Sequence, residues 1–348
     1  MSISPVHQNR HSHEVHRGHH KKHHKEQQHV NADSVSLGGQ QESSPGKELQ
    51  DMKRELGRAS QAEKAPPLGT TSVDIAGKEK VTIGTFNVNW LGGEAAVDMK
   101  PRSDRDYQDI ASIIKDSGAD IMGLEEVGSE EALDRIISNL PGFDYVIGTT
   151  GVRGGGKSQR LAVIYNAEKV QCDKSSMEEI REVMVPELAG EGRLRAPLAV
   201  KMKAGEFDFT LVVCHMKARF DDKAKKIRSA QAGKLNEWIT EKVQSGKEKD
   251  VIVVGDFNDF LDSPPLKKMD SQIYFVTQEA ARKGEASNIK WNSLIDQIGV
   301  TSRAGGAKEN FIERSVFLPD IGPYPSFVER ISDHRPVVAS FRSDSDAQ

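Results

Sequence analysis

From residue 80 onward the chain alternates short apolar runs with turn-forming or charged residues, and this texture limits the folds open to it. Such runs occur at "KVTIGTF", "DIMGL", "FDYVIGT", "LAVIY", "FTLVVCH", "DVIVVGD" and "PVVASF". Each is short, rich in β-branched or aromatic residues and bounded by polar positions. Each therefore predicts a buried or half-buried strand.

Three segments between these runs have the spacing of amphipathic helices. One apolar stripe runs from Tyr107 to Ile114, a second follows a predicted N-cap at Ser129, and a longer one runs from Ile227 to Ile239. Strands and helices mix without strict alternation. The pattern therefore predicts an α/β body of packed sheets rather than a regular doubly wound fold.

Residues 1–78 have a different composition. They carry 11 Lys and Arg against 9 Asp and Glu, and nine histidines fall within the first 30 residues. Such a polar segment buries too little surface to offset its ordering entropy, so we predict a disordered tail. It either binds transition metals through its histidines or is simply a solvated tail. We predict one folded domain over 79–343 and a disordered end at 344–348.

The composition of the whole chain excludes some classes. It is 36% hydrophobic and 29% charged, and no apolar run approaches the roughly 20 residues that cross a bilayer. The N-terminus lacks the apolar stretch of a signal peptide, and two cysteines make no disulfide framework, so we predict a reducing, cytoplasmic setting. Beyond residue 78, 37 Lys and Arg face 43 Asp and Glu, which disfavours broad electrostatic binding of nucleic acid but suits carboxylates around a cation.

The stretch "GVRGGGKSQR" matches the P-loop pattern, with Gly156, Lys157 and Ser158 at its end. A P-loop requires a helix after the motif, because the helix N-terminus helps to hold the phosphates. Here "LAVIY" follows, which predicts a second strand. We therefore interpret the stretch as a hairpin connection and not as a nucleotide site.

Polar side chains collect at the ends of the predicted strands. Only two histidines lie outside the tail, His215 in "CHMKA" and His334 in "SDHRP". The other positions are Asn87, Glu125, Glu126, Asp256, Asn258, Asp296 and Asp333. Carboxylates at such places are costly unless they are paired or bind a cation. An oxygen-rich set without cysteine favours Mg²⁺ or Mn²⁺ over zinc.

The ordered series "FNVNWL", "GLEEV", "RLRAP", "CHMKA", "GDFND", "LIDQI" and "SDHRP" resembles the endonuclease/exonuclease/phosphatase superfamily, in its DNase-like, bacterial-type form. The resemblance covers about residues 80–343. It implies a four-layer α/β sandwich in which two packed mixed sheets are flanked by helices, with the site at one end of the sheets.

The resemblance also implies roles. Glu126, Asn87 and Asp333 would belong to the metal site, with Glu125 a solvated or supporting neighbour. Asp256 would orient or deprotonate the attacking water, and Asn258 would hydrogen-bond the phosphate. His334, steered by Asp296, would act as a base or a charge stabiliser, and His215 would donate to a phosphate oxygen or the leaving group. Arg195 would add positive charge at the rim. The sequence itself shows further local positive charge, which lies at Arg153, Lys157 and Arg160 on the glycine loop and at Lys217, Arg219, Lys223, Lys225, Lys226 and Arg228 after His215.

These expectations favour a Mg²⁺- or Mn²⁺-dependent phosphodiesterase that hydrolyses nucleic acid, acting as a monomer without an obligate protein partner. Two alternatives stay open. One is a phosphatase or phospholipase of the same superfamily, acting on inositol phosphates or sphingomyelin. The other is a non-catalytic nucleic-acid-binding module.

Overall fold

The computed structural model describes residues 79–346, apart from 154, 156, 191, 193, 247, 322 and 323. The tail predicted at 1–78 lies outside the described residues. One sheet has the order β11 (Val337–Arg342), β1 (Lys80–Leu91), β2 (Ile121–Val127), β4 (Arg160–Asn166) and β3 (Phe143–Ile147). The other has the order β5 (Val170–Glu179), β6 (Leu198–Ala204), β7 (Phe207–His215), β8 (Val251–Asp256), β10 (Asp296–Thr301) and β9 (Ile273–Phe275). All seven predicted strands are confirmed.

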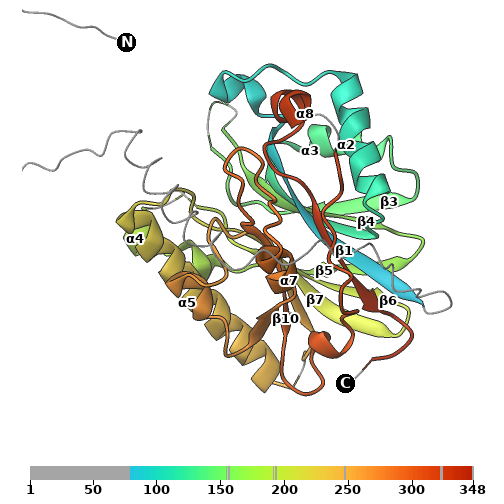
Figure 1. Cartoon of the computed structure of the whole chain (residues 1–348), viewed down its shortest axis with the longest axis vertical. Helices are drawn as coiled ribbons and strands as arrows, with labels where there is room; N and C mark the ends of the chain where they lie inside the picture. The colour runs from blue at the N-terminus through green and yellow to red at the C-terminus, as the bar shows by residue number, and fades with distance from the viewer. Residues whose placement is uncertain are drawn as a thin grey trace, which may run out of the picture. The chain divides into compact units, whose positions relative to one another are not determined.

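Helices flank the sheets on both sides (Figure 1). The longer ones are α2 (Asp104–Asp116), α3 (Glu130–Ile137), α5 (Asp222–Gln244) and α8 (Tyr324–Arg330). Shorter ones are α4 (Pro186–Ala189), α6 (Pro264–Lys267), α7 (Gln278–Arg282) and the 3-10 turns η1 (Glu94–Val97), η2 (Arg181–Met184) and η3 (Ala307–Glu309). The predicted N-cap of α3 is confirmed, since the side chain of Ser129 accepts from the N–H of Ala132.

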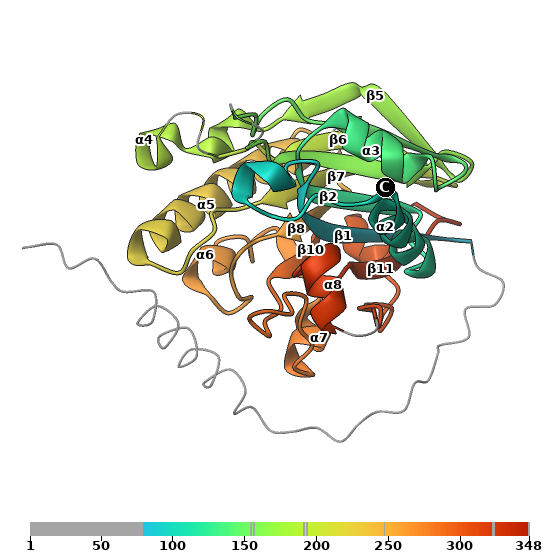
Figure 2. The ribbon, with the colours of Figure 1, turned by 90° about the horizontal axis from the view of Figure 1, so that it is seen from above.

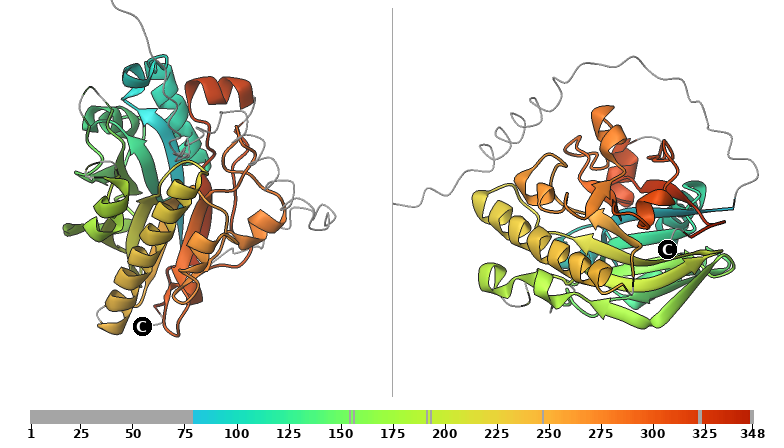
Figure 3. Two further views of the ribbon diagram at one scale, coloured as in Figure 1. Left: turned by 90° about the vertical axis from the view of Figure 1, so that its left-hand side faces the viewer. Right: turned by 90° about the horizontal axis from the view of Figure 1, so that it is seen from below.

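Three hydrophobic clusters separate four layers. Side chains such as Ile83 and Val254 pack between the two sheets, and Leu133 of α3 packs against the outer face of the first sheet. Leu235 of α5 packs against the outer face of the second sheet. Figure 2 shows β1, β2, β7 and β8 between α5 and α2, and Figure 3 shows α5 lying along its sheet. The predicted four-layer sandwich of two mixed sheets is confirmed.

The glycine-rich segment joins β3 to β4, which pair antiparallel. The N–H of Gln159 donates to the carbonyl of Gly151 at 3.0 Å, and the chain continues directly into β4. A strand therefore stands where a P-loop requires a helix. The hairpin interpretation is confirmed, although residues 154 and 156 themselves lie outside the described part.

Two further observations concern a possible membrane span and the C-terminal end of the domain. Among the described residues, no helix is both long and apolar enough to cross a membrane. At the C-terminal end, predicted to be disordered, the carbonyl of Ser345 accepts from Asn310 Nδ2 at 2.8 Å.

Gly255 in β8 precedes Asp256 and has a φ of +145°. A Cβ at this position would lie 1.9 Å from the carbonyl oxygen of Cys214. We expect Gly255→Ala to lower the free energy of unfolding by about 3 kcal/mol or more, because the backbone of two adjacent strands must separate. Urea denaturation followed by tryptophan fluorescence measures this change.

Gly233→Ala in α5 is the matched control, since the nearest atom to its new Cβ is Lys268 Cδ at 3.9 Å. We expect it to raise the free energy of unfolding by about 0.5–1 kcal/mol through the higher helix propensity of alanine. Equal effects of the two substitutions would contradict the assigned geometry of Gly255.

Candidate active site

Polar side chains from both sheets meet where parallel strands end. β1 is parallel to β2 and β7 is parallel to β8, so the carboxyl ends of each pair lie at one edge. His215 and Asp256 are the last residues of β7 and β8 and are partners in register. Because the sheets pack face to face, Asn87 of β1 reaches across, and its Nδ2 donates to Asp256 Oδ2 at 3.1 Å.

Asp256 is the centre of this cluster and is buried. Its Oδ2 lies 3.6 Å from Nε2 of His215 and 3.9 Å from Nε2 of His334. Its Oδ1 accepts from the backbone N–H of Asn258 at 2.8 Å. Two imidazoles thus flank one carboxylate. The Asn258 amide is held beside them, because its Nδ2 donates to the carbonyl of Met216.

Glu126 lies beside Asn87 and His215, at the half-exposed edge of the cluster. Its Oε1 is 3.5 Å from Asn87 Nδ2 and 3.8 Å from His215 Nε2, and its Oε2 accepts from the N–H of Trp90. Glu126 has a φ of 65° and Asn258 has a φ of 52°. Asparagine adopts this left-handed region readily, whereas glutamate is strained there, and backbone strain is concentrated at functional sites.

His334 is held by hydrogen bonds at several of its atoms. Its Nδ1 lies 2.7 Å from Asp296 Oδ2, and its Nε2 lies 2.9 Å from Nδ2 of Asn288. Its backbone N–H donates to Ser332 Oγ, which itself donates to the carbonyl of Asn87. Asp296 is the first residue of β10 and pairs in register with Asp256 of β8. This pairing places both carboxylates beside the imidazole of His334.

Burial and charge shift the ionisation of this cluster. Burial, together with the charge of Asp296, raises the pKa of Asp256 to about 7. Burial would lower the pKa of His334, but the carboxylate of Asp296 outweighs it and raises that pKa well above the usual value. Burial, with the nearby charge of Arg195, lowers the pKa of His215 well below its usual value. His215 is therefore a neutral imidazole at pH 7.

Glu125 is fully buried, so the solvated alternative for this residue is wrong. Its Oε1 accepts from the hydroxyl of Thr85 at 2.6 Å. Burial, with the charges of Asp296 and Asp256, raises the pKa of Glu125 well above its usual value. Its carboxyl group is therefore a neutral acid behind the ionised members of the cluster.

The donor set fits a divalent cation. Within the described part of the chain, Asp256, Asp296 and His334 form a group whose ligand atoms all lie within 4.8 Å of one another. Asp296 Oδ1 and His215 Nδ1 are buried and have no hydrogen-bond partner among the described residues. Carboxylate oxygens with imidazole nitrogen are donors that Mn²⁺ accepts, and the oxygens alone suit Mg²⁺.

The three residues predicted to bind the metal ion differ in their position relative to Asp256. Asn87 and Glu126 adjoin Asp256, as given above. Asp333 is half-buried next to His334 in sequence, and its carbonyl accepts from the N–H of Ile289 at 2.8 Å. The charge of Asp333 contributes to the raised pKa of His334.

The predicted rim residues differ in their distance from the cluster. Arg195 is buried, donates to Gln159 Oε1 at 3.2 Å, and has its pKa lowered to about 10 by burial despite the opposing charges of Glu126 and Asp256. Lys217 is half-buried, and burial lowers its pKa. Arg160 lies 3.4 Å from Glu130, outside the cluster. Arg153 and Lys157 are exposed on the hairpin.

Sequence reasoning placed Arg228 among the rim charges, and this placement is wrong. Arg228 is fully buried, and its Nε lies 2.7 Å from Asp259 Oδ2. It also donates to the carbonyls of Lys217 and Arg219. The ion pair therefore ties the loop after His215 to the loop that carries Asn258. Sequence reasoning also missed Asn288, Ser332 and Thr85, whose contacts bridge distant segments and leave no local pattern.

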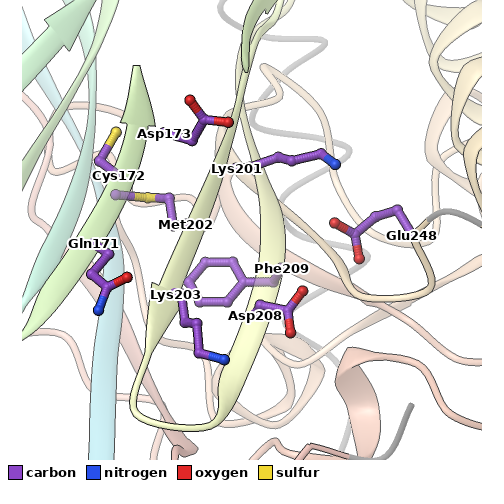
Figure 4. Close-up of a pocket in the computed structure, with 9 residues that line it drawn as sticks. All are labelled: Gln171, Cys172, Asp173, Lys201, Met202, Lys203, Asp208, Phe209 and Glu248. Carbon is purple, nitrogen blue, oxygen red and sulfur yellow. The ribbon is translucent and has the colours of Figure 1, made fainter. Parts of the chain in front are cut away.

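A hollow on the second sheet is separate from the cluster. Figure 4 shows its lining, which consists of Gln171, Cys172, Asp173, Lys201, Met202, Lys203, Asp208, Phe209 and Glu248. Phe209 precedes His215 by six residues of β7, which places the hollow about 20 Å from the cluster along the strand. The hollow is not the candidate active site.

Glu125→Gln tests the neutral state of that buried acid. In metal-free protein with EDTA, the folded Glu125 stays protonated while the unfolded chain ionises above pH 4.3 or so. Its raised pKa therefore makes wild-type stability fall as the pH rises, by at most about 1.4 kcal/mol per pH unit. We expect the stability of Glu125→Gln relative to wild type to increase between pH 5 and pH 8.

Denaturation curves at both pH values measure the difference. Glu241→Gln changes an exposed position on α5 and is the control. Its free energy of unfolding relative to wild type should differ by the same small amount at both pH values. A relative stability of Glu125→Gln that falls with rising pH would mean that Glu125 is ionised in the folded protein.

Comparison with known proteins agrees with this architecture. A model of the Endonuclease/Exonuclease/phosphatase family matches residues 84–334, whereas no curated protein matches the chain. The human Nocturnin catalytic domain with bound sulfate is 20% identical, with 75% of this chain and 94% of that chain covered and a TM-score of 0.55. The D. rerio TDP2 complex with a single-strand DNA product is 13% identical (76% and 99% covered, TM-score 0.56).

A Bacteroides vulgatus endonuclease/exonuclease/phosphatase is 18% identical, with 76% of this chain and 99% of that chain covered and a TM-score of 0.52. These likenesses show a shared fold. The family match spans most of the chain, including every residue of the cluster. The chain belongs to the Endonuclease/Exonuclease/phosphatase family.

Proposed function

We propose that this protein is a divalent-metal-dependent phosphodiesterase that hydrolyses nucleic acid by attack of an activated water. The observation that carries the proposal is the cluster around Asp256, where two imidazoles lie 3.6 and 3.9 Å from one buried carboxylate oxygen. Glu126 and Asn87 adjoin the same carboxylate and supply oxygen donors for the cation. The cation would neutralise charge that develops on the phosphoryl oxygens.

Asp256 and His334 act on the attacking water. With a pKa of about 7, the carboxylate of Asp256 accepts a proton near neutral pH without a large energetic penalty. Asp296 fixes the ring of His334 through Nδ1, so Nε2 faces Asp256. Water placed between Asp256 Oδ2 and His334 Nε2 would contact both groups.

His215 and Asn258 act on the phosphoryl group. Because the pKa of His215 is low, its ring serves as a neutral hydrogen-bond donor and not as an imidazolium. Asn258 adds an amide donor from the adjoining loop, and Arg195 adds positive charge. Together they stabilise negative charge on the non-bridging oxygens and on the leaving oxygen.

Nucleic acid is the substrate class that the rim favours. Lys217 follows β7, which carries His215, and Arg153 and Lys157 lie between β3 and β4, of which β4 pairs with β2. Two proteins of similar fold bind related anions, since the Nocturnin domain holds sulfate and the TDP2 complex holds a single-strand DNA product. The net negative charge of the chain beyond residue 78 disfavours broad attraction for nucleic acid, so a local basic rim would supply it.

Purified protein should hydrolyse a nucleic acid in the presence of Mg²⁺ or Mn²⁺, and EDTA should abolish the activity. Plasmid, single-stranded DNA, RNA, inositol phosphates and sphingomyelin form the substrate panel. His334→Ala and Glu126→Gln should each lower kcat/KM about 100-fold or more, because one removes a group at the reacting centre and the other a metal ligand.

Glu241→Gln, prepared in parallel, is the control for charge change and for trace nucleases. Hydrolysis that persists in His334→Ala at the wild-type rate would exclude the mechanism. Activity on the lipid or inositol phosphate alone would instead assign the site to the phosphatase or phospholipase class. Binding of nucleic acid without hydrolysis would favour a binding module.

The hairpin between β3 and β4 is proposed to contact substrate through Lys157 rather than to bind nucleotide. Lys157→Ala should raise KM for nucleic acid several-fold at low salt and leave kcat within about 2-fold, because an exposed lysine supplies steering and phosphate contact only. Any affinity for ATP should be unchanged, as equilibrium dialysis can determine. Loss of specific ATP binding in this variant would support the rejected P-loop interpretation.

A further inference from the structure

The segment from Ser287 to Ser293 lies against His334. Arg335 N–H donates to the carbonyl of Ser287 at 2.7 Å, and Ile289 N–H donates to the carbonyl of Asp333 at 2.8 Å. These two bonds flank an antiparallel bridge in which Asn288 faces His334. Such a pair, with its hydrogen bonds on either side, brings the two side chains closest together.

Both ends of the Asn288 carboxamide have a partner. Its Oδ1 accepts from the N–H of Trp291 at 2.9 Å, which leaves Nδ2 directed at His334 Nε2 at 2.9 Å. The backbone of Asn288 is fixed as well, since its N–H and carbonyl both bond to Ser293. Asn288 is buried, so water does not compete freely for these groups. An amide NH₂ only donates, and Nε2 must therefore be the acceptor.

We propose that Asn288 is a positioning residue that sets the tautomer of His334 whenever its ring is neutral, with the proton on Nδ1 and the lone pair on Nε2. Asp296 accepts the Nδ1 proton, so the ring is defined at both nitrogens by contacts in its plane. This inference rests on the proposed hydrolysis and decides between the two roles left open for His334. The ring is set as an acceptor for water and not as a donor to a phosphoryl oxygen.

A water bound between Asp256 and His334 would require the same tautomer of His334 as the Asn288 amide. A water that donates one hydrogen to His334 Nε2 and the other to Asp256 Oδ2, 3.9 Å apart, turns its own lone pair away from both acceptors. Water and the Asn288 amide are both donors to Nε2, so both require the same tautomer, with the proton on Nδ1. The phosphorus would lie on the side to which that lone pair points.

Two substitutions separate positioning from simple packing. Asn288→Asp keeps the shape but presents an acceptor to Nε2, which favours a proton on that nitrogen. Asn288→Ala leaves space in which a water can donate instead. With bis(p-nitrophenyl) phosphate and Mn²⁺, we expect kcat to fall about 100-fold or more in Asn288→Asp and no more than about 10-fold in Asn288→Ala.

Asn292→Asp is the control, because it adds the same charge to an exposed position of the same segment. It should leave kcat within about 2-fold of wild type. An Asn288→Asp enzyme as active as Asn288→Ala, or more active, would overturn the proposal, because a purely structural asparagine tolerates the isosteric change better than truncation.

The tautomer can be read without any substrate. Long-range ¹⁵N–¹H spectra of ¹⁵N-histidine-labelled full-length protein in EDTA, assigned by comparison with His334→Gln and recorded from pH 7 to about pH 10, should show that the neutral ring of His334 carries its proton on Nδ1 and none on Nε2. Asn288→Asp should move or add a proton at Nε2. A neutral ring that carries its proton on Nε2 in the wild type would overturn the proposal even if the enzyme hydrolyses nucleic acid. The expected tautomer in a protein without hydrolytic activity would reject the proposed function alone.

Discussion

Buried negative charge at the ends of β2, β8 and β10 is the constraint on which the site depends. Glu125, Asp256 and Asp296 are each no more than 2% exposed, and their charges oppose one another's ionisation. Protonation of Glu125, the partial neutrality of Asp256 and the pairing of Asp296 with His334 relieve this repulsion. What remains is a half-exposed Glu126 beside an Asp256 that titrates near pH 7, an arrangement that gains stability when a cation binds.

Buried arginines hold the loops that carry this cluster. Arg102 pairs with Glu94 and donates to the carbonyls of Val88 and Ile331, which joins the end of β1 to the segment before His334. Arg228 pairs with Asp259 and donates to the carbonyl of Lys217, which joins the loop after β8 to the loop after β7. Breaking either pair would leave a buried charge without compensation, a loss commonly worth about 3–5 kcal/mol. The packed sheets place the strand ends, and these two cations set the loops between them.

The sequence predicted the fold better than it predicted the surroundings of the site. Apolar runs such as "DVIVVGD" predict their strands because burial of both faces requires continuous apolar residues. β5 was missed because "VQCDKSSMEE" is largely exposed at a sheet edge, and β10 because Asp296 and Gln297 are polar yet fully buried. The contact of Asn288 with His334 joins residues 46 positions apart, so only the tertiary structure reveals it.

The proposed function requires one divalent cation bound at the strand ends. Electron paramagnetic resonance of free Mn²⁺, titrated with full-length wild type and with Glu126→Gln, measures it directly. The His-rich tail is present in both proteins, so its binding cancels. We expect the wild type to bind one Mn²⁺ per chain more than Glu126→Gln. Equal stoichiometry and affinity in the two proteins would contradict it.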